Sequence, residues 1–181
     1  MMTIDAREGF ALWFTGLPCS GKTTIARRIE AQLREAGLRV EVLDGDEIRE
    51  HLSPKLGFTK EDRDTHIKRL AYVGKLLVRN GVTVLVAAIS PYREARQYAR
   101  RLIGRCLEVY VNCPVEVCIE RDAKGLYKKA LAGQISAFTG ISDPYEPPNP
   151  PDLELRTDRQ TPDESATIVL GELTRRGLIK M

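Results

Sequence analysis

Apolar residues along this chain gather in short strand-like runs, which are separated by longer stretches whose apolar positions recur every three or four residues. The runs fall at residues 10–14, 39–43, 82–89, 107–112 and 153–157. The stretches with helical spacing cover residues 23–36, 59–81, 114–121 and 162–176. Strands that alternate with helices predict a three-layer α/β fold, in which right-handed crossovers join a mostly parallel central sheet.

Residues with defined roles at helix ends refine this prediction. Thr59 begins a capping-box pattern, so a helix is expected to start there. Ser90, followed by proline, is expected to be the N-cap of another helix. The basic, glycine-punctuated residues 122–141 predict a mobile lid, and the proline-rich residues 143–151 predict an extended connector. Residues 1–8 are expected to form a short polar arm.

Length and composition narrow the class of protein. With 181 residues, the chain suits a single domain that spans residues 1–181. Its net charge of +3, from 28 basic and 25 acidic residues, favours small anionic ligands over nucleic acid. No stretch approaches the roughly 20 apolar residues of a membrane span, and no signal-peptide core is seen, so we expect a cytoplasmic protein without a membrane partner. The four cysteines lack metal-ligand spacing, which predicts reduced, packed thiols.

The most specific motif is Gly-x-x-x-x-Gly-Lys-Thr at residues 16–23, between a predicted strand and a predicted helix. Backbone N–H groups of such a phosphate loop surround phosphate oxygens at the helix N-terminus. Lys22 is expected to reach the β and γ phosphates, and the Thr23 hydroxyl is expected to hold Mg²⁺. A chance match in a glycine-rich turn is the alternative. The predicted ATP contacts in this loop are Gly16, Leu17, Pro18, Cys19, Ser20, Gly21, Lys22, Thr23 and Thr24.

Phosphate loops also serve switch GTPases and motor ATPases, so other features must indicate the reaction. The guanine-reading Asn-Lys-x-Asp motif is absent, and the run at residues 82–89 ends without the acidic residue usual in hydrolytic ATPases. A kinase that transfers the γ-phosphoryl group to a bound acceptor remains. Asp46 is the candidate base, because ligands collect at the carboxyl ends of parallel strands. Asp44 lies at the same edge, and a tight turn with helix capping is the alternative for both aspartates.

Arginines and aromatic rings indicate the kind of acceptor. Arg49 and Arg63 can supply planar forks that bind an anionic group. Arg63 and His66 begin the inward face of their predicted helix, as expected where that helix borders a ligand. Phe58 and Phe138 stand in predicted loops beside glycine and can stack on a planar base. This pattern favours a nucleotide acceptor, and two rings that close the edge of the core are the alternative.

Further motifs are distributed between residues 14 and 157. They are DGD (44–46) with IR (48–49), GFT (57–59), DR (62–63), ISPYR (89–93), RD (121–122), KGLYK (124–128), FTGI (138–141) and DPYE (143–146). Together with the phosphate loop, they resemble the adenylyl-sulfate kinase family. The resemblance implies that the enzyme, with Mg²⁺, transfers the γ-phosphoryl group of ATP to the ribose 3′-hydroxyl of adenosine 5′-phosphosulfate, giving ADP and 3′-phosphoadenosine 5′-phosphosulfate in sulfate assimilation.

The resemblance also implies roles for individual residues. Asp46 would act as the base beside Lys22, the two arginines would grip the phosphosulfate, and the two loop phenylalanines would stack on the acceptor adenine. Ser90 matches a serine labelled a phosphoserine active site in the family, and capping or substrate positioning competes with a catalytic role there. A homodimer and an association with ATP sulfurylase are also implied. The remaining implied contacts are Arg121 for ATP and, for the acceptor, Asp44, His66, Ile89, Ser90, Lys124, Thr139 and Gly140.

The chain departs from the family pattern at His66, where asparagine is usual. If His66 touches the phosphosulfate, tighter acceptor binding is expected below about pH 6.5. Three rival interpretations remain open. A gluconate- or shikimate-type kinase would need no stacking rings. A catalytically silent partner of ATP sulfurylase is opposed by the presence of Lys22, Thr23 and Asp46, and a nucleic-acid binder is opposed by basic residues that are interleaved with acidic ones.

Overall fold

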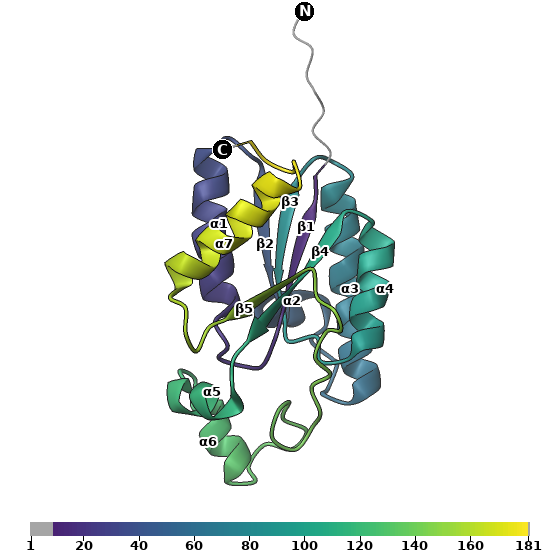
Figure 1. Cartoon of the computed structure of the whole chain (residues 1–181). Coiled ribbons are helices and arrows are strands. Elements are labelled where there is room, and N and C mark those ends of the chain that lie inside the picture. Colours follow the sequence, from purple (N-terminus) through teal and green to yellow (C-terminus); the bar gives the residue numbers. More distant parts are fainter. Residues whose placement is uncertain (1–8, 181) are drawn as a thin grey trace, which may run out of the picture.

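The computed structural model describes residues 9–180, and the predicted polar arm at residues 1–8 lies outside them. Within this range, five strands form one sheet in the order β2-β3-β1-β4-β5 (Figure 1). All strand pairings in this sheet are parallel, which confirms the predicted fold class. The strands are β1 (Ala11–Thr15), β2 (Val40–Asp44), β3 (Thr83–Ala87), β4 (Cys106–Asn112) and β5 (Leu153–Arg156).

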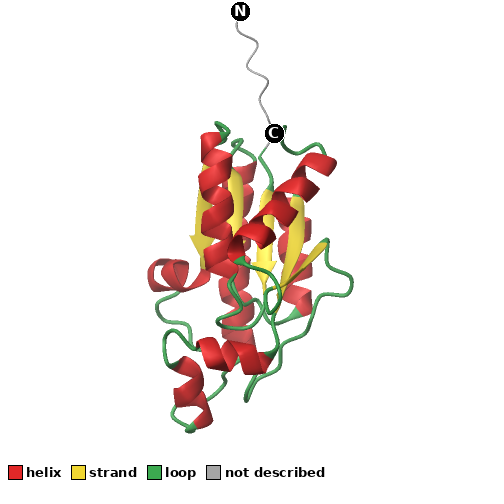
Figure 2. Ribbon diagram, turned by 60° about the vertical axis from the view of Figure 1, so that its left-hand side comes forward, coloured by secondary structure: helices red, strands yellow, loops and turns green. Residues whose placement is uncertain are grey.

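Helices cover both faces of the sheet and give the three predicted layers (Figure 2). One face carries α1 (Lys22–Glu35) and α7 (Pro162–Arg175), and the other carries α3 (Lys60–Val78) and α4 (Arg93–Ile103). Three short helices are α2 (Gly45–Leu52), α5 (Val115–Arg121) and α6 (Leu126–Leu131). Within residues 9–180, no helix is both long enough and apolar enough to cross a membrane.

The side chains of the central strands alternate between two hydrophobic cores. Leu12 and Phe14 of β1 belong to the core beneath α1 and α7, whereas Ala11 and Trp13 belong to the core beneath α3 and α4. Every residue of β1 and β3 is buried, which explains their unbroken apolar character. All four cysteines are free, as predicted. A third, smaller cluster near α5 and α6 contains Cys113, Cys118, Tyr127, Ala130 and Phe138.

The predicted N-cap of α3 is confirmed, but the reciprocal hydrogen bond of a capping box is not formed, because the Asp62 carboxylate binds a different backbone N–H. The Thr59 hydroxyl accepts a hydrogen bond from the backbone N–H of Asp62 at 3.2 Å. The Asp62 carboxylate accepts a bond from the backbone N–H of Gly57 at 3.0 Å, so it holds the preceding loop. At α7 the box is complete, because Thr161 and Glu164 each accept a bond from the other's backbone.

The prediction that Ser90 caps a helix is wrong. Helix α4 begins three residues later, with Tyr92 at its N-cap and no side-chain cap. Ser90 has a φ of 41°, in the left-handed region that few residues other than glycine adopt. Its hydroxyl accepts a hydrogen bond from Trp13 Nε1 at 3.0 Å and donates one to the Ala88 carbonyl at 3.1 Å. These contacts turn the chain away from a helical path.

Helix α2 is an addition to the predicted elements. A tight turn with helix capping was the alternative to a functional role for residues 44–46, and the capping part of that alternative is present in the structure. The Asp44 carboxylate accepts a hydrogen bond from the backbone N–H of Asp46 at 3.0 Å and caps the eight-residue helix α2. No residue of α2 is fully buried, so the helix leaves little apolar periodicity in the sequence.

Candidate active site

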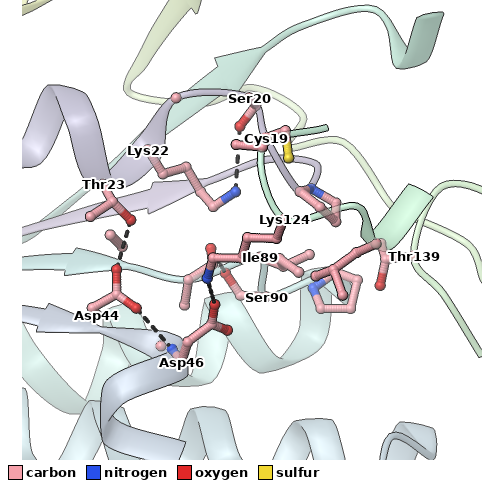
Figure 3. Close-up of a pocket in the computed structure, with 18 of the residues that line it drawn as sticks. Cys19, Ser20, Lys22, Thr23, Asp44, Asp46, Ile89, Ser90, Lys124 and Thr139 are labelled. Carbon is pink, nitrogen blue, oxygen red and sulfur yellow. Dashed lines mark hydrogen bonds and ion pairs between the residues drawn. The ribbon is translucent and has the colours of Figure 1, made fainter. Parts of the chain in front are cut away.

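A cavity of about 860 Å³ opens at the carboxyl end of the sheet (Figure 3). Its wall includes the phosphate loop, parts of α2 and α3, the turn after β3, and residues from the predicted lid. Gly16, Leu17 and Gly140 do not line it. The candidate site residues that do are Pro18, Cys19, Ser20, Gly21, Lys22, Thr23, Thr24, Asp44, Asp46, Arg49, Phe58, Arg63, His66, Ile89, Ser90, Arg121, Lys124, Phe138 and Thr139.

The two glycines of the phosphate loop are required for different structural reasons. A Cβ at Gly16 would lie 2.4 Å from the Val111 carbonyl oxygen, so strand β4 leaves no room for a side chain there. Gly21 has a φ of 103° and occupies the N-cap of α1 without a side-chain cap. The first backbone N–H groups of α1 therefore have no capping side chain, as in an anion-binding helix N-terminus.

Lys22 is a buried cation at the floor of this loop. Its Nζ donates hydrogen bonds to the carbonyls of Leu17 at 2.6 Å and Gly16 at 3.0 Å. Burial lowers the pKa of Lys22 to about 8, and nearby acidic groups including Asp46 partly oppose this effect. A poorly solvated ammonium group in this position gains electrostatic stabilisation from a phosphate oxygen.

Asp44 connects the phosphate loop with α2. Its Oδ2 accepts a hydrogen bond from the Thr23 hydroxyl at 2.7 Å, while its Oδ1 accepts the bond from the Asp46 backbone (Figure 3). Thr23 and Asp44 thus offer adjacent oxygen atoms, the ligand type that Mg²⁺ prefers when phosphates and water complete its shell. Among residues 9–180, no group of three or more His, Cys, Asp or Glu side chains could hold a metal.

Asp46 lies in the first turn of α2 and faces the phosphate loop across the cavity. Its carboxylate is 75 % exposed and accepts a hydrogen bond from Lys124 Nζ at 2.7 Å. In Figure 3, the Lys124 side chain reaches across from the predicted lid to this carboxylate. Pairing with Asp46 raises the pKa of Lys124. An acidic oxygen, a lid cation and the phosphate loop therefore share one cavity.

The two candidate arginines are bound to the loops around the cavity. Arg63 is 7 % exposed and donates hydrogen bonds to the Phe58 carbonyl at 2.8 Å, the Thr139 hydroxyl at 3.0 Å and the Ala137 carbonyl. Arg49 Nη1 donates to the Gly57 carbonyl at 2.9 Å. The two guanidinium carbons lie 5.5 Å (Arg63) and 4.9 Å (Arg49) from the centre of the Phe58 ring. This clustering concentrates positive charge on one wall.

The two candidate stacking rings differ in exposure. Phe58 is 54 % exposed, as expected for a ring offered from a loop. Phe138 is 9 % exposed and packs edge-on against Tyr127, with ring centres 4.9 Å apart. Phe138 therefore belongs to the small core of the lid segment while it also lines the cavity. The sequence left two interpretations of this ring, stacking on a base or closing the edge of the core. The packing of Phe138 in the structure agrees with the second.

His66 does not titrate where the sequence suggested. Its Nε2 donates to the Gly45 carbonyl at 3.0 Å, so its Nδ1 is the nitrogen that accepts the Ser53 hydroxyl, also at 3.0 Å. Burial, assisted by the charge of Arg49, lowers the pKa of His66 to about 4. The expectation of a charge change near pH 6.5 is therefore wrong. His66 instead joins both ends of α2 to α3 as a neutral side chain.

Sequence reasoning missed one end of the cavity. Thr157, Gln160 and Pro162 line it beside Arg121; the first two come from the connection between β5 and α7, and Pro162 begins α7. Thr157 donates a hydrogen bond from its hydroxyl to the Ser20 carbonyl at 2.8 Å, and Arg121 Nη2 donates to the Thr157 carbonyl at 2.5 Å. These residues carry no motif, and only the fold brings them next to the phosphate loop.

A phosphate loop on a five-stranded parallel sheet, with an acidic residue and a basic segment across the same cavity, defines the class of P-loop kinases. The family model described as adenylylsulphate kinase matches residues 8–156. The chain therefore belongs to the adenylylsulphate kinase family. This match favours the family assignment over a gluconate- or shikimate-type kinase.

Relatives and solved structures agree with the family match. The adenylyl-sulfate kinase of Halothermothrix orenii is 58 % identical over 175 residues, covering 97 % of this chain and 95 % of that protein. That of Rippkaea orientalis is 56 % identical over 173 residues and covers 96 % of each chain. The Mycobacterium tuberculosis APS kinase CysC, in complex with AMPPNP and APS, superposes with a TM-score of 0.90 at 43 % identity, covering 92 % of this chain and 98 % of that one.

Proposed function

We propose that this protein transfers the γ-phosphoryl group of ATP to the 3′-hydroxyl of adenosine 5′-phosphosulfate, giving ADP and 3′-phosphoadenosine 5′-phosphosulfate for sulfate assimilation. Family membership and the adenylyl-sulfate kinases that match nearly the whole chain support this function. The observation that carries the mechanism is the single cavity in which Lys22 and Asp46 face each other, linked through Thr23 and Asp44.

On the donor side, backbone N–H groups of the phosphate loop and Lys22 bind the β and γ phosphates. Thr23 and Asp44 fit a role in holding Mg²⁺, Thr23 directly and Asp44 through its contact with the Thr23 hydroxyl. When bound, this ion neutralises negative charge that develops on the phosphates. Arg121 and the neighbouring Thr157 border the end of the cavity beside Ser20, where the ATP adenine would lie.

On the acceptor side, the positive wall formed by Arg49 and Arg63 attracts the phosphosulfate group. Phe58 stacks on the acceptor adenine through its exposed face, and Phe138 contributes from the lid segment. The remaining proposed acceptor contacts come from the turn after β3 and from the lid, and they are Ile89, Ser90, Lys124 and Thr139; Gly140 lies outside the cavity wall and is proposed to act through its neighbour Thr139. His66 supports the same wall indirectly, because its hydrogen bonds hold α2, which carries Arg49.

Asp46 orients the acceptor hydroxyl and takes its proton as the phosphoryl group is transferred. Lys124 leaves Asp46 for the transferred phosphate when the lid closes over both substrates, which frees the carboxylate to accept the proton. A covalent role for Ser90 would need a base within hydrogen-bond distance, whereas its hydroxyl bonds an indole N–H and a carbonyl oxygen. We therefore assign Ser90 to positioning.

We make three further proposals from membership of this family. The chain acts as a single cytoplasmic domain of residues 1–181, with residues 122–141 as its lid. It forms a homodimer. It associates with an ATP sulfurylase, the enzyme class that makes the acceptor, and it needs neither nucleic acid nor a membrane.

The function is tested by ADP release from Mg·ATP with a panel of acceptors that contains adenosine 5′-phosphosulfate, gluconate and shikimate. Of the three acceptors, we expect only adenosine 5′-phosphosulfate to cause ADP release, and we expect its 3′-phosphorylated product to form. Release of ADP with only a sugar acid would contradict the proposal.

Asp46→Asn tests the proposed base. The substitution keeps the size of the side chain but removes its proton-accepting charge, so we expect kcat to fall by about 10²- to 10⁴-fold while the affinity for Mg·ATP stays within about twofold. The matched control is Glu47→Gln, an exposed neighbour on the same helix that does not line the cavity. Equal losses of kcat and ATP affinity in Asp46→Asn would show that the residue does not act as a base.

A further inference from the structure

Arg96 of α4 is a buried cation outside the cavity wall, with a relative exposure of 1 %. Each nitrogen of its guanidinium group has a different partner. Nε donates to Glu108 Oε1 at 2.6 Å, Nη1 donates to the Ser90 carbonyl at 2.7 Å, and Nη2 donates to the Glu146 carbonyl at 2.6 Å. One side chain therefore joins β4, the turn after β3 and the proline-rich connector.

The connector lies directly against the turn through further contacts. The backbone N–H of Glu146 donates to the Pro91 carbonyl at 2.9 Å, and the Glu146 carboxylate accepts a bond from the Arg93 backbone at 2.8 Å. The hydroxyls of Tyr145 and Thr15 are 2.9 Å apart, and Thr15 donates to the Ile89 carbonyl at 2.8 Å. Because Thr15 uses its proton on Ile89, Tyr145 is the donor in the first of these two bonds.

This assembly lies behind the part of the cavity wall formed by residues 89–91, which we call the acceptor wall because it contains the proposed acceptor contacts Ile89 and Ser90. Ile89, Ser90 and Pro91 line the cavity, and the connector residues 143–147 follow the lid segment directly in the chain. The positive φ of Ser90 persists only if surrounding contacts hold it, because a side chain is strained there. Arg96 binds the carbonyl of this strained residue and also the connector.

We propose that Arg96 is a positioning residue for the acceptor. It fixes the turn at residues 89–91 relative to the connector at residues 143–147, and so sets where the acceptor wall lies relative to the anchored end of the lid. Arg96 itself touches no substrate. The proposal rests on the proposed function for the identity of the acceptor.

The chemistry of the contact distinguishes positioning from simple stabilisation. A buried ion pair whose only role is stability can be replaced by apolar residues of similar volume without loss. The two carbonyl contacts require the fixed, planar fork of arginine, and the single ammonium of lysine cannot span three acceptors in these directions. Lysine at this position keeps a charge near Glu108 and loses the geometry.

The test compares Arg96→Lys with Glu108→Gln. We expect Arg96→Lys to raise the KM for adenosine 5′-phosphosulfate by about tenfold or more, because charged hydrogen bonds to the wall are lost, and to leave the KM for ATP within about twofold. Glu108→Gln breaks the ion pair but keeps both carbonyl contacts, so it should lower the Tm and leave the acceptor KM within about twofold. Calorimetric titration of the acceptor in the presence of ADP gives the same comparison without turnover.

Three outcomes would overturn the proposal: an unchanged acceptor KM in a folded Arg96→Lys variant, an equal rise of both KM values, or a rise in Glu108→Gln as large as in Arg96→Lys. If Arg96→Lys does not fold, the double variant Arg96→Met/Glu108→Met removes the buried charges together and is judged by the same criteria. A wild-type protein that does not phosphorylate adenosine 5′-phosphosulfate would contradict the proposed function, whereas an active wild type with an unaffected Arg96→Lys contradicts only this inference.

Discussion

At the scale of single residues, His66 illustrates how burial fixes the chemistry of a side chain. It donates to one end of α2 at Gly45 and accepts a hydrogen bond from the other end at Ser53. Its ring is 4 % exposed, and the charged groups around it are Arg49 and Asp46 on α2 and Arg69 on α3. Protonation of the accepting nitrogen would break the bond from Ser53. His66 is therefore held neutral and supports the helix that carries the proposed base.

This environment predicts a pH dependence of folding. The pKa of His66 is about 4 in the folded protein and about 6.5 when unfolded. Between these values the unfolded state binds more protons, so the contribution of His66 to stability is complete above pH 6.5 and is lost as the pH falls towards 4. We expect the free energy of unfolding to gain about 3 kcal/mol from this group across that window.

Urea unfolding of the wild type and of His66→Gln between pH 4 and 8 measures this contribution. The stability difference between the two proteins should grow as the pH rises to 6.5 and then stay constant. His51→Gln changes the only other histidine, which is exposed, and should leave the pH dependence unchanged. A constant difference between wild type and His66→Gln across the whole range would contradict the assignment.

At the scale of elements, the first turn of α3 serves both folding and the cavity. Thr59 caps this helix, and Arg63 and His66 follow on its inward face, where both are buried. The first turn of α7 has an equivalent cap at Thr161 but carries no proposed acceptor contact. The two caps therefore have similar structural roles, but only the cap of α3 lies next to a proposed acceptor contact, Arg63.

Substitution of either cap should have the same effect on stability and different effects on function. We expect Thr59→Ala and Thr161→Ala each to lower the free energy of unfolding by about 1 kcal/mol, because each leaves the first turn of a helix without its side-chain acceptor. Only Thr59→Ala should raise the KM for the acceptor severalfold, since Arg63 lies in the turn that it releases. Denaturant titration and initial rates measure both quantities, and an equal change of KM in both variants would contradict this role of α3.

At the scale of the whole molecule, the described chain has two large cores around the sheet and a third, smaller cluster where α5 meets the lid segment. The small cluster meets the phosphate loop, since Leu17 and Cys19 pack against it and the Tyr127 hydroxyl donates to the Pro18 carbonyl at 3.0 Å. Further bonds from this segment to the cavity are the exposed pair of Lys124 and Asp46 and the bonds that Arg63 donates to Thr139 and Ala137. The proposed lid is thus held to the cavity by packing against the phosphate loop and by polar bonds near both its start and its end.

This arrangement predicts protection of the lid by substrates. Trypsin should cut free protein after the exposed Lys124, Lys128 and Lys129, and addition of a non-hydrolysable ATP analogue with the acceptor should slow these cuts severalfold. Cleavage after the exposed Arg175 on α7 is the internal control and should not change. Equal cleavage of the lid with and without both ligands would contradict closure.

The sequence alone predicted the structure correctly where a local pattern and the fold agree. The apolar runs predicted β1 and β3 because both strands are buried on both faces, and the phosphate loop could be recognised because its residues are contiguous. Local signals failed where distant residues decide the structure. Ser90 resembles a helix cap in sequence, but Trp13 and Arg96 hold it in a left-handed turn. Helix α2 was missed because it buries no residue completely.

Asp44 has a consequence for redesign of this enzyme. One carboxylate contacts both the threonine that follows the phosphate-loop lysine and the start of the helix that carries Asp46. The residues proposed to recognise the acceptor come from α2, from α3 and the loop before it, from the turn after β3 and from the lid segment. A designer who wishes to retarget the kinase to a new hydroxyl compound should therefore exchange those groups and leave Asp44 untouched, because it joins the phosphate loop to the helix that carries the proposed base.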